Sequence, residues 1–483
     1  MIFFTPALKG NVIKLSCNEL KANELAFICV DKNQKNPTQM QLKTKVQIIE
    51  ELKSFQQQSN AQNILYKDGE NSFTRDRCLS FEKTALFIAR SPKKSLSVEL
   101  EEYFSDLGCP KAVCTKSALC QRRKQLKPCL FEDWNQVLVQ SYYHYNRNHL
   151  KRWKGYRLHA VDGSTAYLMD RPSVVDHFGV QTNQSTAIAM GRVMNCFDVL
   201  NGISVRSQIS PIVESELGIA IDWVEQIEDD VISIYDRGYG FFAVFFMHLH
   251  GFETEKKFVI RCKQNANLRV IEFVASNQRS QIVELKPSRQ AIDRLGKLGY
   301  RLNKSSMIKI RLLRIELDDG EIEVLATNLM CNKQYPYSCF KKLYFMRWAV
   351  ETEYDSWKNT NQLEQFSGHS PRVIYQDFYA NVLIANLHQM LIADCEKEVK
   401  IISAQRKYEY KVNRNVTFGL FKREMANLFS LTDISTKKTL ELLKHLFCKY
   451  IEPIRPGRSL PRIHKSRRLN GKYLTYTNYK RAV

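Results

Sequence analysis

The chain has 483 residues, of which 44% are hydrophobic and 25% charged. This composition excludes a disordered or fibrous protein, and the length allows several domains with a sizeable core. Lys and Arg outnumber Asp and Glu by 72 to 50, and the formal net charge of +22 favours a polyanionic partner, nucleic acid first and an anionic membrane second.

The sequence does not indicate a membrane-spanning, a secreted or a zinc-binding protein. No apolar run approaches the roughly 18 to 20 residues that span a bilayer, so we expect neither a membrane protein nor a membrane partner. The first ten residues lack the basic and apolar regions of a secretory signal. The 13 cysteines show no spacing typical of a zinc site, and they fit reduced thiols in a cytosol.

The N-terminal part is predicted to be helical only from residue 76 to 150, and residues 1–75 receive no assignment. "SVELEEYFSDLG" is a helix that ends at Gly108, and "TKSALCQRRKQL" is a second helix with a cap at Thr115 or Ser117. Together they fit a helix-turn-helix that binds DNA, although a basic helix in a bundle explains the second segment nearly as well. The side chains that would face DNA are Gln121, Arg122, Arg123 and Lys124.

Residues 151–263 change to a mixed pattern of strands and helices. "YRLHAVDGS" is predicted to be a strand, and a hairpin with an Asn-Gly turn at Asn201 and Gly202 follows. A helix, the strand "VISIYDRGYG", the helix "FFAVFFMHLH" and the strand "KFVIRCK" complete this part. Such an order indicates an α/β fold with a mixed sheet and helices on its faces.

The rest of the chain divides into three parts. Residues 264–335 are predicted to be a β-rich insertion with strands at "LRVIEFVAS", "QIVELK", "MIKIRLLRIEL" and "EIEVLATNL". Helical patterning returns in residues 336–400 and continues through 401–483. The tail from residue 455 is rich in Lys and Arg without acidic residues, which indicates an arm that binds polyanions.

Two aspartates end apolar strands and are candidates for chemistry. Asp162 precedes Gly163, and Asp236 lies two residues before Gly238. An unpaired carboxylate at the end of a buried strand is costly, so each needs a cation, a cap or a metal as partner. The alternative is an ordinary strand-end Asp before a turn.

A third carboxylate lies in the later segment "LYFMRWAVETEYDSWK". On a helix of about 100° per residue, Tyr344, Arg347, Glu351 and Lys358 fall within about 60° of one another and form one axial row. Asp355 lies close to the same row, so geometry alone does not single out Glu351. A solvated helix face is the alternative interpretation, and we expect Trp348 and Trp357 to serve helix packing.

Three carboxylates from two strands and a helix suit hard divalent cations. Mg²⁺ prefers oxygen ligands, and Mn²⁺ is expected to substitute for it. Two such ions, about 3.5 to 4 Å apart, can activate a nucleophile and stabilise the leaving oxygen in phosphodiester chemistry. The predicted metal ligands and catalytic residues are Asp162, Asp236 and Glu351.

The candidate residues and their spacing resemble the signature of a known protein family. The spacing of Tyr344, Arg347, Glu351 and Lys358 matches the YREK signature of prokaryotic insertion-sequence DDE transposases, the insertion sequence 4 family. "HAVDGST" and "YDRGYG" look like the contexts of the two catalytic aspartates, and the resemblance covers about residues 75–450.

The resemblance implies an RNase H-like core with Asp162 on the first strand, Asp236 on the fourth and Glu351 on a late helix. It also implies a DNA transposase that binds terminal inverted repeats, cleaves at the element ends and joins the 3′-hydroxyls to target DNA. Tyr344, Arg347 and Lys358 would then hold the transposon end. A homodimer in a synaptic complex and a cytoplasmic, nucleoid-associated location in a prokaryote follow from the same resemblance.

One departure from the family and two rival functions remain. Hairpin-forming relatives stack a flipped base on an aromatic residue, often Trp, in the insertion, where this chain has no Trp. Tyr300, Tyr335 or Tyr337 could substitute, because any aromatic face can stack a base. The rival functions are an RNase H-like nuclease without strand transfer and an inactive, transposase-derived DNA-binding protein.

Overall fold

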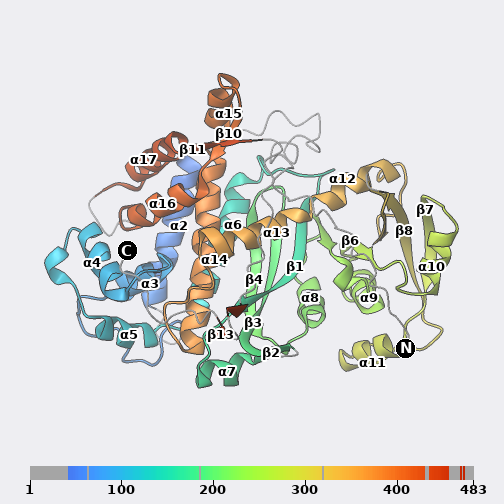
Figure 1. Cartoon of the computed structure of the whole chain (residues 1–483), viewed down its shortest axis with the longest axis horizontal. Helices are drawn as coiled ribbons and strands as arrows, with labels where there is room; N and C mark the ends of the chain where they lie inside the picture. Colours follow the sequence, from blue (N-terminus) through green and yellow to red (C-terminus); the bar gives the residue numbers. More distant parts are fainter. Residues whose placement is uncertain are drawn as a thin grey trace, which may run out of the picture.

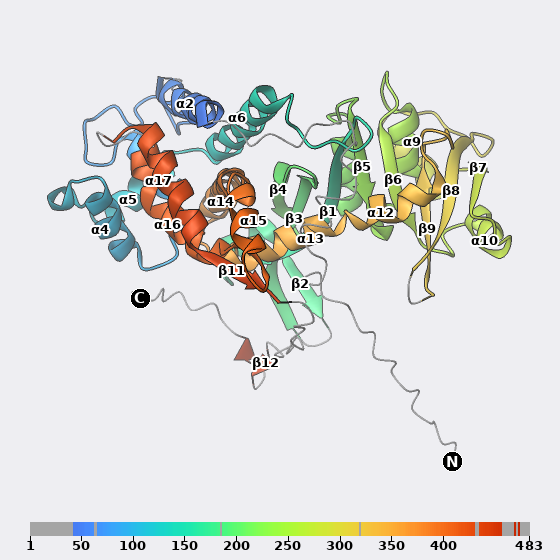
Figure 2. The ribbon, with the colours of Figure 1, turned by 90° about the horizontal axis from the view of Figure 1, so that it is seen from above.

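The computed structural model describes residues 42–61, 65–183, 186–317, 320–429 and 434–455, and two short strands in the tail. A large sheet lies at the centre, helices from both ends of the chain gather at one end of it, and the segment around residues 264–335 lies at the other (Figures 1 and 2). In the described ranges, no helix is long and apolar enough to cross a membrane.

Nine strands of the described chain form the sheet. Its core has the order β4-β3-β1-β5-β6, in which β3 is antiparallel to β1 and β4, whereas β5 is parallel to β1 and β6 parallel to β5. This topology confirms the predicted α/β, RNase H-like fold, and the Asn201–Gly202 turn joins β3 to β4 as expected. The core strands are β1 (Arg157–Tyr167), β3 (Thr186–Asp198), β4 (Ile203–Pro211), β5 (Val231–Tyr235) and β6 (Lys257–Cys262), and the short β2 (Val180–Asn183) pairs with β3.

Helices cover both faces of this sheet (Figure 2). Side chains of α8 (Glu216–Val224) and α9 (Phe242–His250) pack with Val161 of β1 on one face. Side chains of α13 (Trp348–Asp355) and α14 (Pro371–Ala393) pack on the other face, where Ala160 points. Because strand side chains alternate between faces, Asp162 points to the face of α13. The remaining core helix is α7 (Pro172–Phe178).

The segment after β6 is less β-rich than predicted. "LRVIEFVAS" forms the helix α10 (Leu268–Ala275), because the Asn267 side chain accepts a hydrogen bond from the Val270 amide and caps a helix start despite the β-branched residues. A second helix, α11, begins after the cap residue Ser288. The predicted strands that do form extend the core sheet through β6-β9-β8-β7. These elements are β7 (Ser280–Leu285), α11 (Arg289–Lys297), β8 (Ile308–Glu316) and β9 (Ile322–Thr327).

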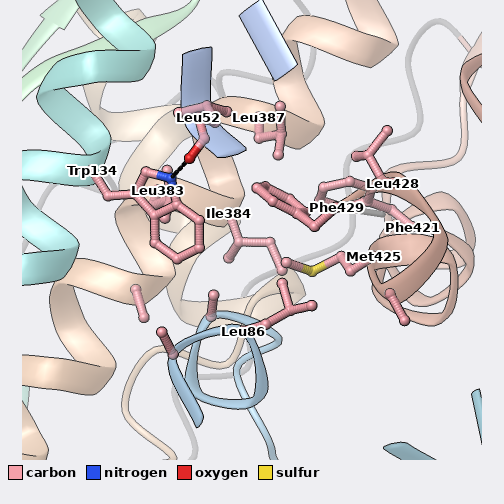
Figure 3. Close-up of a cluster of buried hydrophobic side chains, with 14 of the residues drawn as sticks. Leu52, Leu86, Trp134, Leu383, Ile384, Leu387, Phe421, Met425, Leu428 and Phe429 are labelled. Carbon is pink, nitrogen blue, oxygen red and sulfur yellow. Dashed lines mark hydrogen bonds between the residues drawn. The ribbon is translucent and has the colours of Figure 1, made fainter. Parts of the chain in front are cut away.

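The helical part at the other end of the sheet has a large core of its own (Figure 3). Trp134 is fully buried there, and its indole N–H donates to the Leu52 carbonyl oxygen at 3.0 Å. Leu52 belongs to a helix that our assignment of residues 1–75 missed. The core joins helices far apart in sequence: α2 (Leu42–Ala61), α3 (Phe81–Ala89), α4 (Leu96–Asp106), α5 (Lys116–Lys124), α6 (Cys129–Asn146), α14, α16 (Arg414–Leu428) and α17 (Thr436–Lys449).

The C-terminal part adds α15 (Glu396–Ala404) and a two-stranded sheet of β10 (Glu409–Val412) and β11 (Ile451–Ile454). Within the described residues, the helical patterning predicted for residues 401–483 is present as α16 and α17, alongside the strands β10 and β11. Most of the basic tail lies outside the described residues, apart from the short strands β12 (Arg468–Leu469) and β13 (Lys472–Tyr473).

Candidate active site

Strand register places the two predicted aspartates side by side. Val161 of β1 pairs with Tyr235 of the parallel strand β5, and Asp162 and Asp236 are the next residue in each case. Asp236 directly follows the carboxyl end of β5, whereas Asp162 lies in the middle of β1, which continues to Tyr167 along β3, so the prediction that Asp162 ends a strand is wrong. The two aspartates are neighbours because the parallel pairing of β1 with β5 stops at this level. Asp162 is held further along β1 by pairing with Asn195 of β3.

The predicted helix row lies across these aspartates, although the helix is interrupted. It begins with α12 (Phe340–Phe345), continues as α13 and ends in the π-helical turn η4 (Ser356–Thr360). The amides of Arg347 and Val350 bond to carbonyl oxygens three residues earlier, so the break is a tightening of the helical path. Side chains at positions three or four apart still share one side of it.

Tyr344 and Arg347 contact the aspartates from this segment. The Tyr344 hydroxyl donates to Asp236 Oδ1 at 3.4 Å. The Arg347 guanidinium group lies 3.8 Å from Asp162 Oδ2, and its Nη2 donates to Glu351 Oε1 at 2.8 Å. The Arg347 side chain is 3% exposed, and its Nε and Nη1 atoms have no hydrogen-bond partner in the described structure. A buried cation with unused donors therefore lies among the three predicted carboxylates.

The electrostatics of the carboxylates reflect this crowding. The pKa of Asp162 is raised from its ordinary value of 3.8 to about 7, chiefly by burial, with smaller contributions from the negative charges of Glu351 and Asp236, and the attraction of Arg347 opposes this rise. Among Asp162, Arg347 and Glu351, the side chain of Glu351 is the most exposed, at 39%. The three acids are thus close enough to repel one another, and a cation relieves that repulsion.

Two further contacts fix the helix segment to β1. Lys358 Nζ donates to Ser164 Oγ at 2.9 Å and to the Thr165 carbonyl oxygen at 2.8 Å. The Tyr354 hydroxyl donates to the carbonyl oxygen of Asp162 at 2.7 Å. Tyr344, Arg347 and Lys358 of the predicted row therefore contact Asp236 or β1 directly, and Glu351 is linked to β1 through Arg347. Tyr354, which was not predicted from the sequence, anchors the residue that carries the first carboxylate.

Neighbours of the row have different roles. Asp355 is exposed and accepts a hydrogen bond from the Asn359 side chain at 2.7 Å. Trp357 is fully buried, as expected, and donates to Glu353. Trp348, in contrast, is 38% exposed and lies beside the Arg347 guanidinium group, so the expectation that it serves helix packing is wrong.

The basic helix α5 differs from the prediction that four of its side chains face DNA. Arg122 and Arg123 are buried. Arg123 forms an ion pair with Asp377 of α14 and donates to Gln376 at 2.6 Å, whereas Arg122 lies over the Phe73 ring and donates to Gln125. These two side chains serve packing between helices rather than an open DNA surface. The expected DNA contacts of α5 then rest on the exposed Gln121 and Lys124.

The three tyrosines considered for base stacking already have protein partners. Tyr335 is 4% exposed and stacks on the Trp153 ring. The Tyr300 hydroxyl donates to Gly251, and the Tyr337 hydroxyl donates to Arg314. None of the three presents an open ring like that of Trp348 in this conformation of the described chain.

The carboxylates of the site differ in how closely they approach one another. Within the described ranges, no three His, Cys, Asp or Glu side chains converge closely enough to hold a metal ion. The chemistry of the donors nevertheless fits a hard divalent cation, since the carboxylates of Asp162 and Glu351 lie against one guanidinium group and Asp236 is next to Asp162 in strand register. Coordination by all three requires Glu351 to leave Arg347.

Two charged residues beside this site were not found from the sequence. Arg261 of β6 and Glu323 of β9 form an ion pair of 2.8 Å, and the charge of Glu323 interacts with Asp236 and Arg347. Only the pairing of β6 with β9 brings them together, and no motif in the sequence signals it.

One comparison with known proteins covers the segment that contains this site. Residues 153–387 match the model of a family described as "Transposase DDE domain", and this segment contains Asp162, Asp236 and Glu351. No curated protein matches the chain. Among solved structures, the chain is similar to a piggyBac transposase in a synaptic complex with hairpin DNA, with a TM-score of 0.39, 9% identity and 89% of each chain covered. The family match supports a transposase.

Proposed function

We propose that this protein is a DNA transposase that cleaves at the ends of an insertion sequence and joins the 3′-hydroxyls to target DNA. The observation that carries the proposal is the register of Asp162 and Asp236 on adjacent parallel strands with Glu351 above them. The match of residues 153–387 to a transposase DDE domain supports the same reaction. The predicted terminal inverted repeats and the insertion sequence 4 family belong to this proposal.

Asp162, Asp236 and Glu351 would hold Mg²⁺, with Mn²⁺ as a substitute. The bound ions would activate the attacking oxygen and stabilise the leaving oxygen of the phosphodiester. The protein itself fixes the first two carboxylates through strand register and carries the third on a helix that Tyr354 and Lys358 fasten to β1. Exposure of Glu351 leaves it free to turn toward the ions.

Tyr344, Arg347 and Lys358 would hold the transposon end. Arg347 has two nitrogens without hydrogen-bond partners in the described structure, and a phosphate oxygen would satisfy them. The net charge of +22 favours the long stretches of DNA that both ends and a target supply. A homodimer would bring two ends together, and the expected place of action is the nucleoid of a prokaryotic cell.

A strand-transfer assay tests the proposal. The purified protein is incubated with duplexes of the DNA that flanks its coding sequence, a supercoiled plasmid and Mg²⁺ or Mn²⁺. We expect cleavage at the repeat ends and joining to the plasmid, both lost in the triple variant Asp162→Asn, Asp236→Asn, Glu351→Gln. Cleavage without joining would favour a nuclease, and binding without cleavage an inactive DNA-binding protein. Full activity of the triple variant would refute the mechanism.

A further inference from the structure

A basic residue lies in register with the two aspartates. Ile260 of β6 pairs with Tyr235 of the parallel strand β5, so Arg261 follows at the same level as Asp236. Val259 of β6 packs with α12 side chains on the sheet face to which Asp162 also points. By strand alternation, Arg261 faces that side as well. Asp162, Asp236 and Arg261 therefore form a row across three neighbouring strands.

Two carboxylates from the segment after β8 hold Arg261 in place. Its Nη1 atom lies 2.8 Å from Glu323 Oε1, and its Nη2 atom lies 3.5 Å from Glu321 Oε1. The Arg261 side chain is 19% exposed and that of Glu323 only 11%. The guanidinium group is thus fixed by a largely buried partner and keeps an open edge.

Glu323 belongs electrostatically to the candidate active site. Burial raises its pKa against the attraction of Arg261, and the charge of Asp236 raises it while that of Arg347 lowers it. The pair of Arg261 and Glu323 is therefore near enough to sense both the second aspartate and the arginine between the carboxylates.

The backbone of Arg261 is also fixed against the loop that follows Asp236. A Cβ atom at Gly240 would lie 2.9 Å from the Arg261 carbonyl oxygen, which is closer than such atoms approach. Only a glycine lets the loop pack against β6 at this point. Strand register, the loop and the carboxylates together determine where the guanidinium group lies.

We propose that Arg261 binds a DNA phosphate beside the reacting end and that Glu323 positions its guanidinium group. This inference rests on the proposed function, because it assigns one more contact for the same DNA. Arg is suited to the task, since its planar group binds a carboxylate on one edge and a phosphate on another. Divalent ions would neutralise the neighbouring acids, which leaves Arg261 as the next cation along the row for the following phosphate.

The competing explanation is purely structural: the pair ties β6 to β9. The two explanations predict different effects for the two partners. If the pair is only a tie, Arg261→Gln and Glu323→Gln break the same bond and weaken folding and DNA binding alike. If Arg261 binds phosphate, Arg261→Gln weakens DNA binding, whereas Glu323→Gln removes a competing negative charge and leaves binding equal or tighter.

The experiment measures binding of the full chain to a fluorescent duplex of the flanking DNA over a series of salt concentrations. Ca²⁺ is present so that the carboxylates can bind a cation. Arg314→Gln is the matched control, because Arg314 is a 20% exposed, acid-paired arginine on β8 whose side chain alternates to the other face of the sheet. Melting temperatures are recorded for all variants.

For Arg261→Gln we expect about a tenfold or greater loss of affinity and a salt slope smaller by about one, the effect of one lost phosphate contact. Arg261→Lys should keep the slope and lose less affinity, and Arg314→Gln should match the original protein. The inference fails if Arg261→Gln binds like Arg314→Gln, or if Arg261→Gln and Glu323→Gln lose affinity and melting temperature equally. Failure of the original protein to bind this DNA would instead refute the proposed function.

Discussion

Arg347 and Glu351 form an ion pair across one helical turn, with Nη2 2.8 Å from Oε1, and the same guanidinium group lies 3.8 Å from Asp162. The arginine thus occupies the space between carboxylates that a divalent cation would share. If Glu351 is a metal ligand, as we propose, the binding of a metal ion would compete with this ion pair, because one carboxylate cannot serve both partners fully. The free energy of that exchange is expected to set the affinity for the metal.

Glu351 and Asp355 provide a direct test of which acid on the helix is functional. Both lie on α13, one turn apart, but only Glu351 contacts Arg347, and Asp355 is exposed and bonded to Asn359. We predict that Glu351→Gln lowers the rate of DNA cleavage by about a thousandfold or more, since several kcal/mol of transition-state stabilisation depend on the ions. Asp355→Asn should leave the rate within about twofold, as expected for an exposed surface substitution.

Rates of cleavage in Mg²⁺ and circular dichroism spectra of the two variants check this prediction. A similar loss in both variants, with the fold intact, would contradict the assignment of Glu351 as the metal ligand.

Asp162 should destabilise the metal-free fold at neutral pH. Its pKa in the folded chain is about 7, above the ordinary 3.8, so the folded state binds more protons between these values. The stability that Asp162 contributes is therefore complete below about pH 4 and is lost as the pH rises through about 7. Asp162→Asn removes this loss, and we predict a gain of about 1–3 kcal/mol near pH 8, less the weakened attraction to Arg347.

Urea unfolding of both proteins between pH 4 and pH 8 in EDTA measures this difference. The gain should grow with pH, and Mg²⁺ should reduce it by stabilising the original protein alone. A difference that stays constant with pH would show that Asp162 titrates normally.

Much of the catalytic core could be predicted because its signals are local. The residue pattern of β1 and the Asn201–Gly202 turn predicted the neighbouring antiparallel strands β1, β3 and β4. The spacing from Tyr344 to Lys358 predicted a row of side chains, which the structure brings to Asp162 and Asp236. These features depend on residues a few positions apart, which a single sequence displays directly.

The errors arose where distant segments decide the outcome. Whether Arg123 faces DNA or Asp377 depends on a partner 254 positions away, and the composition of α5 is the same in both cases. The pairing of β6 with β9 likewise brings Arg261 to Glu323 without any sequence motif. At "LRVIEFVAS", the Asn267 cap outweighed β-branched composition, which is a weak indicator of strand.

Arg123 and Lys124 are neighbours with opposite expected effects. Arg123 is buried against Asp377. Burial by itself would raise the pKa of Asp377, but the positive charges of Arg123 and Lys93 lower it more strongly, so the pKa of Asp377 lies below its ordinary value. Arg123→Ala leaves a buried charge without its main partner and should cost about 3–5 kcal/mol of folding free energy. Lys124→Ala should change stability by less than about 0.5 kcal/mol and, if α5 binds DNA, weaken DNA binding.

Denaturant titrations and binding of a short duplex separate the two effects. A stability loss in Lys124→Ala as large as that in Arg123→Ala would contradict the described packing of α5 against α14.

Gly240 and Gly238 test whether the loop after Asp236 needs its close contact with β6. A Cβ atom at Gly240 would meet the Arg261 carbonyl oxygen at 2.9 Å, whereas one at Gly238 would meet nothing within 4 Å. Backbone cannot move aside as a flexible side chain can, so we predict that Gly240→Ala costs about 1–3 kcal/mol of stability. It should also shift Asp236, and a displacement of about 1 Å can lower the rate of cleavage by about a hundredfold. Gly238→Ala should keep both properties, and thermal unfolding with a cleavage assay on the same preparations decides the matter. Equal behaviour of the two variants would mean that the loop yields without moving the aspartate, and strand register alone would then hold Asp236 in place.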